Sequence, residues 1–369
     1  MKITGVELLR IAMPLVAPFR TSFGTQTSRD ILLVRVVTPE AEGWGECVAM
    51  DEPRYSPEYT GAAADVLARF LVPAITAAGD MTATAVGTAL AGFKGHPMAK
   101  AALETAVLDA ELRAAGLSLA RYLGATSSRV VCGVSVGIAG SVPELLDAVA
   151  GYLADGYRRV KLKIEPGWDA EPVRAVRERF GDILLQVDAN TAYTLADARQ
   201  LAALDPFGLL LIEQPLAEDD LRGHAELARM LRTPICLDES ITSAHTAADA
   251  IALGACRIVN IKPGRVGGYL EARRIHDVCA AHGVPVWCGG MLETGIGRAA
   301  NLALAALPGF ALPGDTSASA RYYQQDITPP FVLDQGHLPV PDGPGIGVDP
   351  LAGPLDAVTT SRQWLPADR

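Results

Sequence analysis

The sequence predicts an α/β protein in which a closed barrel of parallel strands follows a smaller α+β unit. From about residue 130 onward, short apolar runs rich in β-branched residues alternate with segments of helical spacing. The first 125 or so residues lack this alternation. A length of 369 residues suits a barrel of roughly 200 to 250 residues plus a second unit. We therefore predict a (β/α)7β TIM-like barrel with an α+β capping domain.

Eight apolar runs are the predicted barrel strands. Near-continuous apolar strands that alternate with helices favour parallel pairing under a cover of helices. After the third run, Leu195, Ala198 and Leu201 share one face of a predicted helix, with Thr194 as N-cap and Asp197 at the third helical position. The runs occupy residues 130–135, 159–163, 183–188, 209–213, 235–238, 258–262, 284–288 and 310–315.

The amino-terminal part has a different pattern. Residues 32–38 and 43–49 are typical of antiparallel strands joined by a turn, and the Ala-rich residues 101–116 are typical of a helix. The tail is rich in Pro and Gly and too irregular for another βα unit. The predicted domains are the capping domain over 1–126, the barrel over 127–325 and a C-terminal segment, 326–369, that packs back on the capping domain.

Composition excludes several classes of function. The formal net charge is −10, so the chain has no excess of cations with which to bind nucleic acid or an anionic membrane surface. The longest uncharged stretch, residues 299–314, contains two prolines, and we expect no segment to span a bilayer. The amino terminus shows no cleavage site, and the six cysteines are scattered. We expect a cytoplasmic protein without disulfides or a zinc cluster.

Charged residues end five consecutive barrel runs: Lys163, Asp188, Glu213, Asp238 and Lys262. They recur at intervals of 25, 25, 25 and 24 residues. The carboxyl ends of barrel strands form the mouth where catalytic groups converge. We therefore expect these five side chains to meet in one cavity.

The three carboxylates Asp188, Glu213 and Asp238 predict a metal site. Like charges in a small cavity force one another to protonate unless a cation compensates them. Oxygen ligands without nearby His or Cys indicate Mg²⁺ or Mn²⁺ rather than zinc. For any one carboxylate alone, an N-cap or a salt bridge is the more common role.

Three of the six lysines lie at strand ends, although the chain uses Arg at its other 26 cationic positions. A group that exchanges a proton must be Lys, because Arg stays protonated. Lys163 and Lys262 stand on opposite sides of the predicted ring, so they can serve the two faces of a substrate α-carbon. A cation would stabilise the enediolate formed when the α-proton leaves. Lys161 is a neighbouring helper, for which a buried salt bridge is the alternative.

This pattern resembles the enolase superfamily, and within its muconate-lactonising subgroup the N-succinylamino acid racemase/o-succinylbenzoate synthase group. The resemblance covers the whole chain and rests on KLK at 161–163 and on the runs LQVDANTAYT, LLIEQPL, ICLDES and VNIKPGRVGG. It implies Mg²⁺, with Mn²⁺ or Co²⁺ as substitutes, on Asp188, Glu213 and Asp238. It also implies acid/base catalysis by Lys163 and Lys262 on a small N-acylated amino acid or related carboxylate, in a homo-oligomer.

The resemblance also implies two cap loops over the barrel mouth, at residues 18–26 and about 50–59.

Arg265 is expected to lower the pKa of Lys262, because a like charge disfavours the ammonium form; a loop salt bridge is its alternative role. The apolar side chains expected to form the substrate pocket, Phe23 among them, suit a substrate with a large apolar amino acid side chain. Core packing is the alternative role for each of them. The predicted substrate-binding residues are Phe19, Met50, Tyr55, Ser135, Lys161, Asn190, Arg265, Met291, Leu292 and Tyr322.

Several activities remain open on the sequence alone. A mandelate-racemase type would use a His–Asp dyad where this chain has Lys262. A dipeptide epimerase would carry an Asp-x-Asp pair where this chain has Asp315, Thr316 and Ser317, which favours an acylated, neutral amine. A dedicated o-succinylbenzoate synthase and a muconate cycloisomerase use the same metal and lysines. A Schiff-base aldolase needs no carboxylate trio, and an inert binding module would be expected to have lost one of the five strand-end charges.

Overall fold

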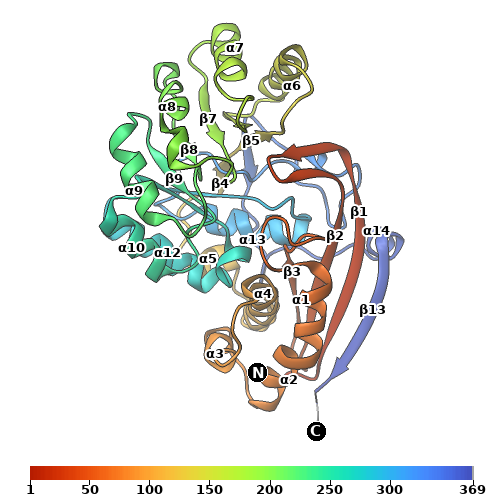
Figure 1. Ribbon diagram of the computed structural model, residues 1–369. Helices are drawn as coiled ribbons and strands as arrows, with labels where there is room; N and C mark the ends of the chain where they lie inside the picture. Colours follow the sequence, from red (N-terminus) through yellow and green to blue (C-terminus); the bar gives the residue numbers. More distant parts are fainter. Residues whose placement is uncertain (368–369) are drawn as a thin grey trace.

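The amino-terminal part of the chain forms an antiparallel sheet, seen in red and blue in Figure 1. The computed structural model describes residues 1–367. The predicted pairing of residues 32–38 with 43–49 is confirmed, with Leu32 opposite Cys47 and Val37 opposite Glu42. The sheet has the order β13-β1-β2-β3, with β1 (Gly5–Thr21), β2 (Gly24–Val37), β3 (Glu42–Cys47) and β13 (Thr359–Pro366).

Helix α4 packs against β3 of this sheet and confirms the predicted helix at 101–116. Gly43 and Gly45 allow the close approach, since a Cβ on either would lie within 2.1 Å of the backbone oxygen of Ala106 or Ala102. A side chain at these positions would push the helix away from the sheet. The helices of this part are α1 (Thr60–Val66), the π-helical turn η1 (Leu67–Leu71), α2 (Val72–Ala77), α3 (Ala83–Ala89), α4 (Pro97–Ala114) and α5 (Leu119–Leu123).

One helical stretch differs from the expectation that no segment could span a bilayer. Because α1, η1 and α2 follow one another without a break, residues 60–77 form one helix of 18 residues with mean hydropathy 1.3. By length and composition alone, this helix could cross a membrane. In the fold its inward side chains Leu67, Leu71 and Ile75 are fully buried, while Asp65 and Arg69 form an exposed ion pair on its outside.

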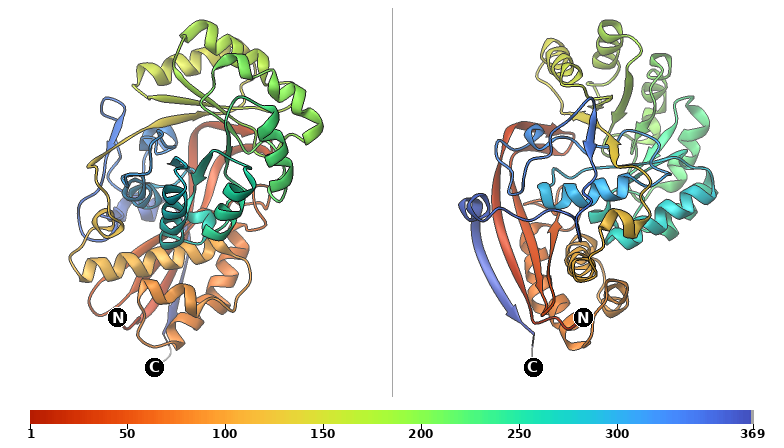
Figure 2. Two further views of the ribbon diagram at one scale, coloured as in Figure 1. Left: turned by 90° about the vertical axis from the view of Figure 1, so that its left-hand side faces the viewer. Right: turned by 180° about the vertical axis from the view of Figure 1, so that it is seen from behind.

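The parallel strands curl into the predicted barrel, with helices on its outside (Figures 1 and 2). The Thr194–Asp197 capping box is confirmed at the start of α8, as a short 3₁₀ turn. Seven strands pair in chain order, namely β5 (Gly133–Val136), β6 (Arg159–Lys163), β7 (Leu184–Asp188), β8 (Ile212–Glu213), β9 (Ile235–Leu237), β10 (Ile258–Ile261) and β11 (Val286–Cys288). The covering helices are α6 (Val142–Ala154), α7 (Ala170–Phe180), α8 (Ala198–Ala202), α9 (Leu221–Met230), α10 (Ala244–Leu253), α11 (Pro263–Val266), α12 (Tyr269–Ala281) and α13 (Gly295–Ala305).

The eighth predicted strand, residues 310–315, is not a continuous strand. It closes the ring through single bridges, from Phe310 to Val286 and from Gly314 to Cys132. Pro313 has no N–H to give to a ladder, which explains why regular pairing fails here. Beyond it lie the 3₁₀ turn η4 (Ser319–Arg321), β12 (His337–Pro339), which pairs with β4 (Arg129–Val131), and α14 (Ala352–Val358).

Buried carboxylates of the amino-terminal part hold the first turns of two barrel helices. Glu46 of β3 accepts hydrogen bonds from the backbone N–H and hydroxyl of Thr294 and from the N–H of Gly297, at the start of α13. Glu104 of α4 accepts from the N–H of Leu270 at the start of α12. These donors have no partner within their own helix. The antiparallel unit therefore fixes the helices that flank the last barrel strands.

Glu46→Gln is expected to weaken the dependence of unfolding free energy on pH. Burial raises the pKa of Glu46 from 4.5 to about 7. The folded state therefore holds more protons than the unfolded chain between these values, so the stability from protonated Glu46 is complete below about pH 4.5 and falls as the pH rises through 7. The shift corresponds to about 3 kcal/mol.

Urea unfolding of wild type and Glu46→Gln at pH 5, 6, 7 and 8 measures this difference. Glu42→Gln is the matched control, because Glu42 lies on the same strand but is exposed. Equal pH slopes for Glu46→Gln and wild type would contradict the expectation.

Candidate active site

The parallel register of the barrel brings the five strand-end charges together. Lys163 lies opposite Asp188 on the neighbouring strand, and Asp188 lies opposite Glu213. Asp238 and Lys262 directly follow β9 and β10. All five are buried at the carboxyl ends of their strands. They meet because side chains at equivalent positions of parallel strands lie at the same level of the barrel.

Lys161 is the centre of the charge network. Its Nζ lies 3.1 Å from Asp188, 3.0 Å from Glu213 and 2.7 Å from Asp315. Lys163 Nζ lies 2.6 Å from Asp188 and donates to Asn190 Oδ1 at 2.6 Å. Burial opposes ionisation of Asp188, but the two lysines outweigh it and hold its pKa below the ordinary value.

Lys262 belongs to a second group on the far side of the ring. Its Nζ lies 2.7 Å from Asp238 and donates to the hydroxyl of Tyr55 at 3.0 Å. Burial alone would lower the pKa of Lys262, but Asp238 together with Tyr55, Glu239 and Glu213 outweighs burial and raises this pKa well above the ordinary value. The two lysines thus stand in separate ion-paired groups.

The alternative role expected of Arg265, a salt bridge, is present in the structure, while its expected effect on the pKa of Lys262 stays a prediction. Arg265 lies 3.0 Å from Asp238 and donates to the backbone oxygens of Glu239 and Ile241. Arg265 and Lys262 share the Asp238 carboxylate, whose single negative charge does not neutralise both cations. Arg265 lies behind Asp238 and does not line the cavity described next.

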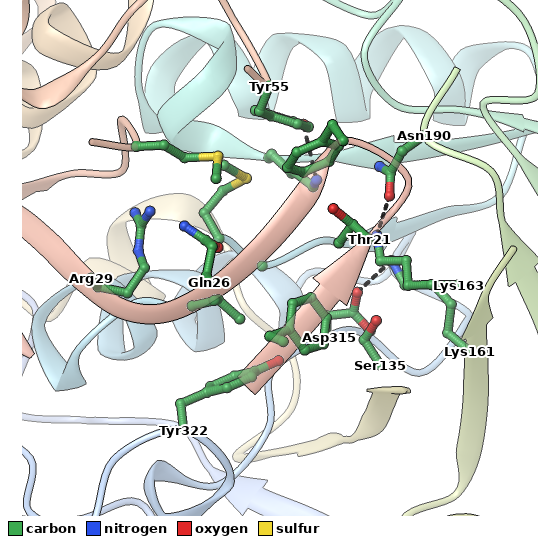
Figure 3. A pocket seen from close by; sticks show the side chains of 17 residues that line it. Thr21, Gln26, Arg29, Tyr55, Ser135, Lys161, Lys163, Asn190, Asp315 and Tyr322 are labelled. Carbon is green, nitrogen blue, oxygen red and sulfur yellow. Dashed lines mark hydrogen bonds and ion pairs between the residues drawn. The ribbon is translucent and has the colours of Figure 1, made fainter. Parts of the chain in front are cut away.

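A cavity of about 500 Å³ opens beside these charges. Figure 3 shows Lys161 and Lys163 entering it from one side. Nine of the ten predicted substrate-binding residues line it, all except Arg265: Phe19, Met50, Tyr55, Ser135, Lys161, Asn190, Met291, Leu292 and Tyr322. Phe23 and both predicted catalytic lysines line it as well. Asp188, Glu213 and Asp238 are fully buried and do not line it.

Two segments of the antiparallel unit form one wall of the cavity. Residues 18–26, expected as a loop, are the end of the β1–β2 hairpin, with Phe19 opposite Gln26 in the ladder. Residues 50–59 are irregular, as expected of a loop. The ring of Phe23 from the first segment lies 5.7 Å from the ring of Tyr55 in the second.

Sequence reasoning did not single out five residues that line the cavity, namely Thr21, Gln26, Arg29, Gly290 and Asp315. Asp315 ends the eighth apolar run, so the rule that selected the other strand ends would have found it. Nothing in the sequence around Arg29 marks it as buried, because its neighbour Asp30 is also charged and suggests an exposed strand.

Comparison with known proteins identifies the family of both parts of the chain. Residues 3–124 match the family model of the mandelate racemase/muconate lactonizing enzyme N-terminal domain. Residues 144–352 match the model of the enolase C-terminal domain-like family. The chain belongs to the enolase superfamily. It is therefore an enzyme of a fold built from a capping domain and a barrel.

Relatives of this enolase-superfamily member include two curated enzymes and a solved structure. It is 70% identical to an N-succinylamino acid racemase of Amycolatopsis sp, covering 99% of this chain and 100% of that one. It is 51% identical to an o-succinylbenzoate synthase of Geobacillus kaustophilus, covering 93% and 92% of the two chains. A solved enolase-superfamily member from Listeria innocua superposes with a TM-score of 0.96 at 40% identity, covering 100% of each chain.

Members of the enolase superfamily generally use Mg²⁺, and a dipeptide epimerase from Cytophaga hutchinsonii, 25% identical to this chain with a TM-score of 0.90, was solved with Mg and a dipeptide. The donor set here fits a hard divalent cation, because Asp188, Glu213 and Asp238 offer only oxygen. Burial and the nearby Asp188 raise the pKa of Glu213 to about 8, so the lysines do not fully compensate this carboxylate. Among residues 1–367, no three His, Cys, Asp or Glu side chains are gathered as ligands, since Lys161 lies between the acids.

Proposed function

We propose that this enzyme racemises N-succinylamino acids and related N-acylamino acids. The observation that carries the proposal is the pair of buried lysines, Lys163 and Lys262, which line one cavity from separate ion-paired groups. The 70% identical Amycolatopsis racemase supports it. Identity to o-succinylbenzoate synthases, at 51% for Geobacillus kaustophilus, supports dehydration to o-succinylbenzoate in the same site.

In the proposed mechanism, one lysine acts as base and the other as acid. A neutral amine at Lys163 or Lys262 removes the α-proton on its own face of the substrate, and the ammonium of the other lysine returns a proton to the opposite face. When the two lysines exchange these roles, the same steps convert the opposite enantiomer back into the first one. Asp188 and Asn190 hold Lys163, while Asp238 and Tyr55 hold Lys262. Dehydration needs one base, which later protonates the leaving hydroxyl.

Asp188, Glu213 and Asp238 are the proposed ligands of Mg²⁺, with Mn²⁺ or Co²⁺ as substitutes. When bound, the cation would stabilise the negative charge that develops on the substrate carboxylate as the α-proton leaves. In the proposal, Lys161 and Asp315 remain paired beside this site and keep its charge balanced. A cytoplasmic location and a homo-oligomer are also part of the proposal.

The chain has Asp315 after the last strand but no second acidic residue at position 317, and this difference from an Asp-x-Asp pair supports an acylated substrate. Asp315 is held by Lys161 and by Arg159 at 2.8 Å, and position 317 is a serine that donates to the backbone oxygen of Gly133. Neither leaves a free carboxylate pair for a substrate ammonium group. A neutral amide nitrogen fits this end of the cavity better than the free amine of a dipeptide.

Proton NMR in deuterium oxide tests the proposal. One enantiomer of N-succinyl-phenylglycine, and separately of N-acetyl-methionine, is incubated with enzyme and Mg²⁺ while the α-proton signal and optical rotation are followed. Both are expected to decay. Dehydration to o-succinylbenzoate in a parallel assay, without α-exchange of either amino acid, would instead indicate a dedicated synthase. Loss of neither signal, with no dehydration, would overturn the proposal.

A further inference from the structure

Arg29 of β2 is a buried cation in the cavity wall. Its side chain is 2% exposed, yet it lines the cavity together with Gln26 of the same strand. One terminal nitrogen donates to the backbone oxygens of Val48, at 3.0 Å, and Ala49, at 3.3 Å. The Nε atom of Arg29 and the Nε2 atom of Gln26 are buried without a hydrogen-bond partner.

Arg29 differs in its charge environment from the other cations of the cavity. The cationic side chains that line it are Arg29, Lys161, Lys163 and Lys262. Each lysine has at least one carboxylate within 3.1 Å. Within residues 1–367, no carboxylate lies within 4.0 Å of the Arg29 guanidinium. A buried charge without a counter-charge is costly, and a bound anion would remove that cost.

The position of Arg29 separates it from the reacting end of the site. In Figure 3, Arg29 and Gln26 lie on one side of the cavity, and Lys161 and Lys163 lie on the other. A substrate whose α-carbon is between the lysines therefore directs its remaining atoms toward the cap. The two unpartnered donors would meet the part of the substrate farthest from the reacting carbon.

We propose that Arg29 binds the terminal carboxylate of a dicarboxylic acyl group, with Gln26 as a second donor. The inference rests on the proposed function, which places the α-carboxylate and the lysines at the opposite end. A guanidinium and a carboxylate form paired, charge-assisted hydrogen bonds. Arg29 then selects a succinyl group over an acetyl group, and it binds the succinyl chain of the dehydration substrate in the same way.

The test compares substrates that differ only in this charge. N-succinyl-phenylglycine, its terminal amide N-succinamoyl-phenylglycine and N-acetyl-phenylglycine are assayed with wild type and Arg29→Gln. We expect Arg29→Gln to lower kcat/KM for the succinyl substrate by about 10- to 100-fold, the range for a charged hydrogen bond. The two uncharged acyl substrates should change by less than about 3-fold.

Matched variants separate recognition from folding. Arg35→Gln removes the same charge from the same strand outside the cavity, where Arg35 is paired with Glu7 and Glu42, and it should leave the succinyl preference unchanged. Arg29→Lys should retain part of the preference. The ratio of two substrates on one protein sample does not depend on the fraction folded, so loss of the carbonyl contacts at Val48 and Ala49 does not mimic the effect.

Equal losses for all three substrates in Arg29→Gln, or an unchanged ratio, would overturn the inference. Calorimetric titration with o-succinylbenzoate and with o-acetylbenzoate measures the same contrast without turnover. If wild type exchanges no α-proton, the proposed function fails. The titration still decides Arg29, because only a carboxylate-binding role makes Arg29→Gln weaken o-succinylbenzoate selectively.

Discussion

Lys163→Ala and Lys262→Ala should each abolish racemisation, with a loss of at least about 10³-fold in kcat. Inversion needs a base on one face of the α-carbon and an acid on the other, so neither lysine can replace its partner. The pKa of the substrate α-carbon lies more than ~10 units above that of an ammonium, so proton transfer from it to an amine is uphill by more than ~13 kcal/mol. A residue distant from the α-carbon cannot overcome this difference. Optical rotation of N-succinyl-phenylglycine measures the loss.

Each single variant should still exchange the α-proton of one enantiomer with deuterium oxide. The remaining lysine can remove the proton on its own face and return a deuteron to the same face. The two variants should therefore favour opposite enantiomers. Lys94→Ala is the control, because Lys94 is exposed and outside the cavity. Near wild-type racemisation by either variant would refute the two-lysine mechanism.

Removal of divalent metal with EDTA should also abolish turnover, and added Mg²⁺, Mn²⁺ or Co²⁺ should restore it. The physical reason is the incompletely compensated charge at Glu213, whose pKa is raised to about 8 by burial and by Asp188. A divalent cation on these oxygen donors would favour the ionised form and lower that pKa.

Calorimetry provides a readout that does not depend on turnover. Asp188→Asn, Glu213→Gln and Asp238→Asn should each weaken Mg²⁺ binding, whereas Lys262→Ala should retain it. Glu165→Gln removes an acid outside the cavity, where Glu165 is paired with Arg20, and should leave the affinity unchanged. Full activity after exhaustive dialysis against EDTA would contradict a metal requirement.

The strand-end residues were predictable because the end of each strand in a parallel barrel can be recognised in the sequence, as the end of an apolar run. Apolar runs that end in Lys163, Asp188 and Glu213 at a constant interval can be recognised without coordinates. The same rule would have identified Asp315, which ends the eighth run. The pairing of the carboxylates with lysine was expected only as the alternative role of Lys161, since the rule gives position and not the partner of each charge.

The residues that the sequence did not reveal depend on contacts between distant segments. Arg29 is buried where it donates to the backbone oxygens of Val48 and Ala49, which are 19 and 20 residues further along the chain. The partner of Arg265 could not be identified from its own segment, because Asp238 comes from another strand end. Residues 18–26 were expected to be a loop from the family resemblance, but cross-strand pairing makes them a hairpin.

The pairing of β13 with β1 has a consequence for synthesis of the protein. Gly5 pairs with Pro366 and Leu9 with Arg362, so the first strand meets this partner only when almost the whole chain has left the ribosome. During translation one edge of β1 stays open, and an open edge can pair with strands of other chains. Contacts of such long sequence separation also form slowly. The nascent chain therefore depends on late closure of this sheet, and chaperones that shield exposed strands would act on it before residue 359 emerges.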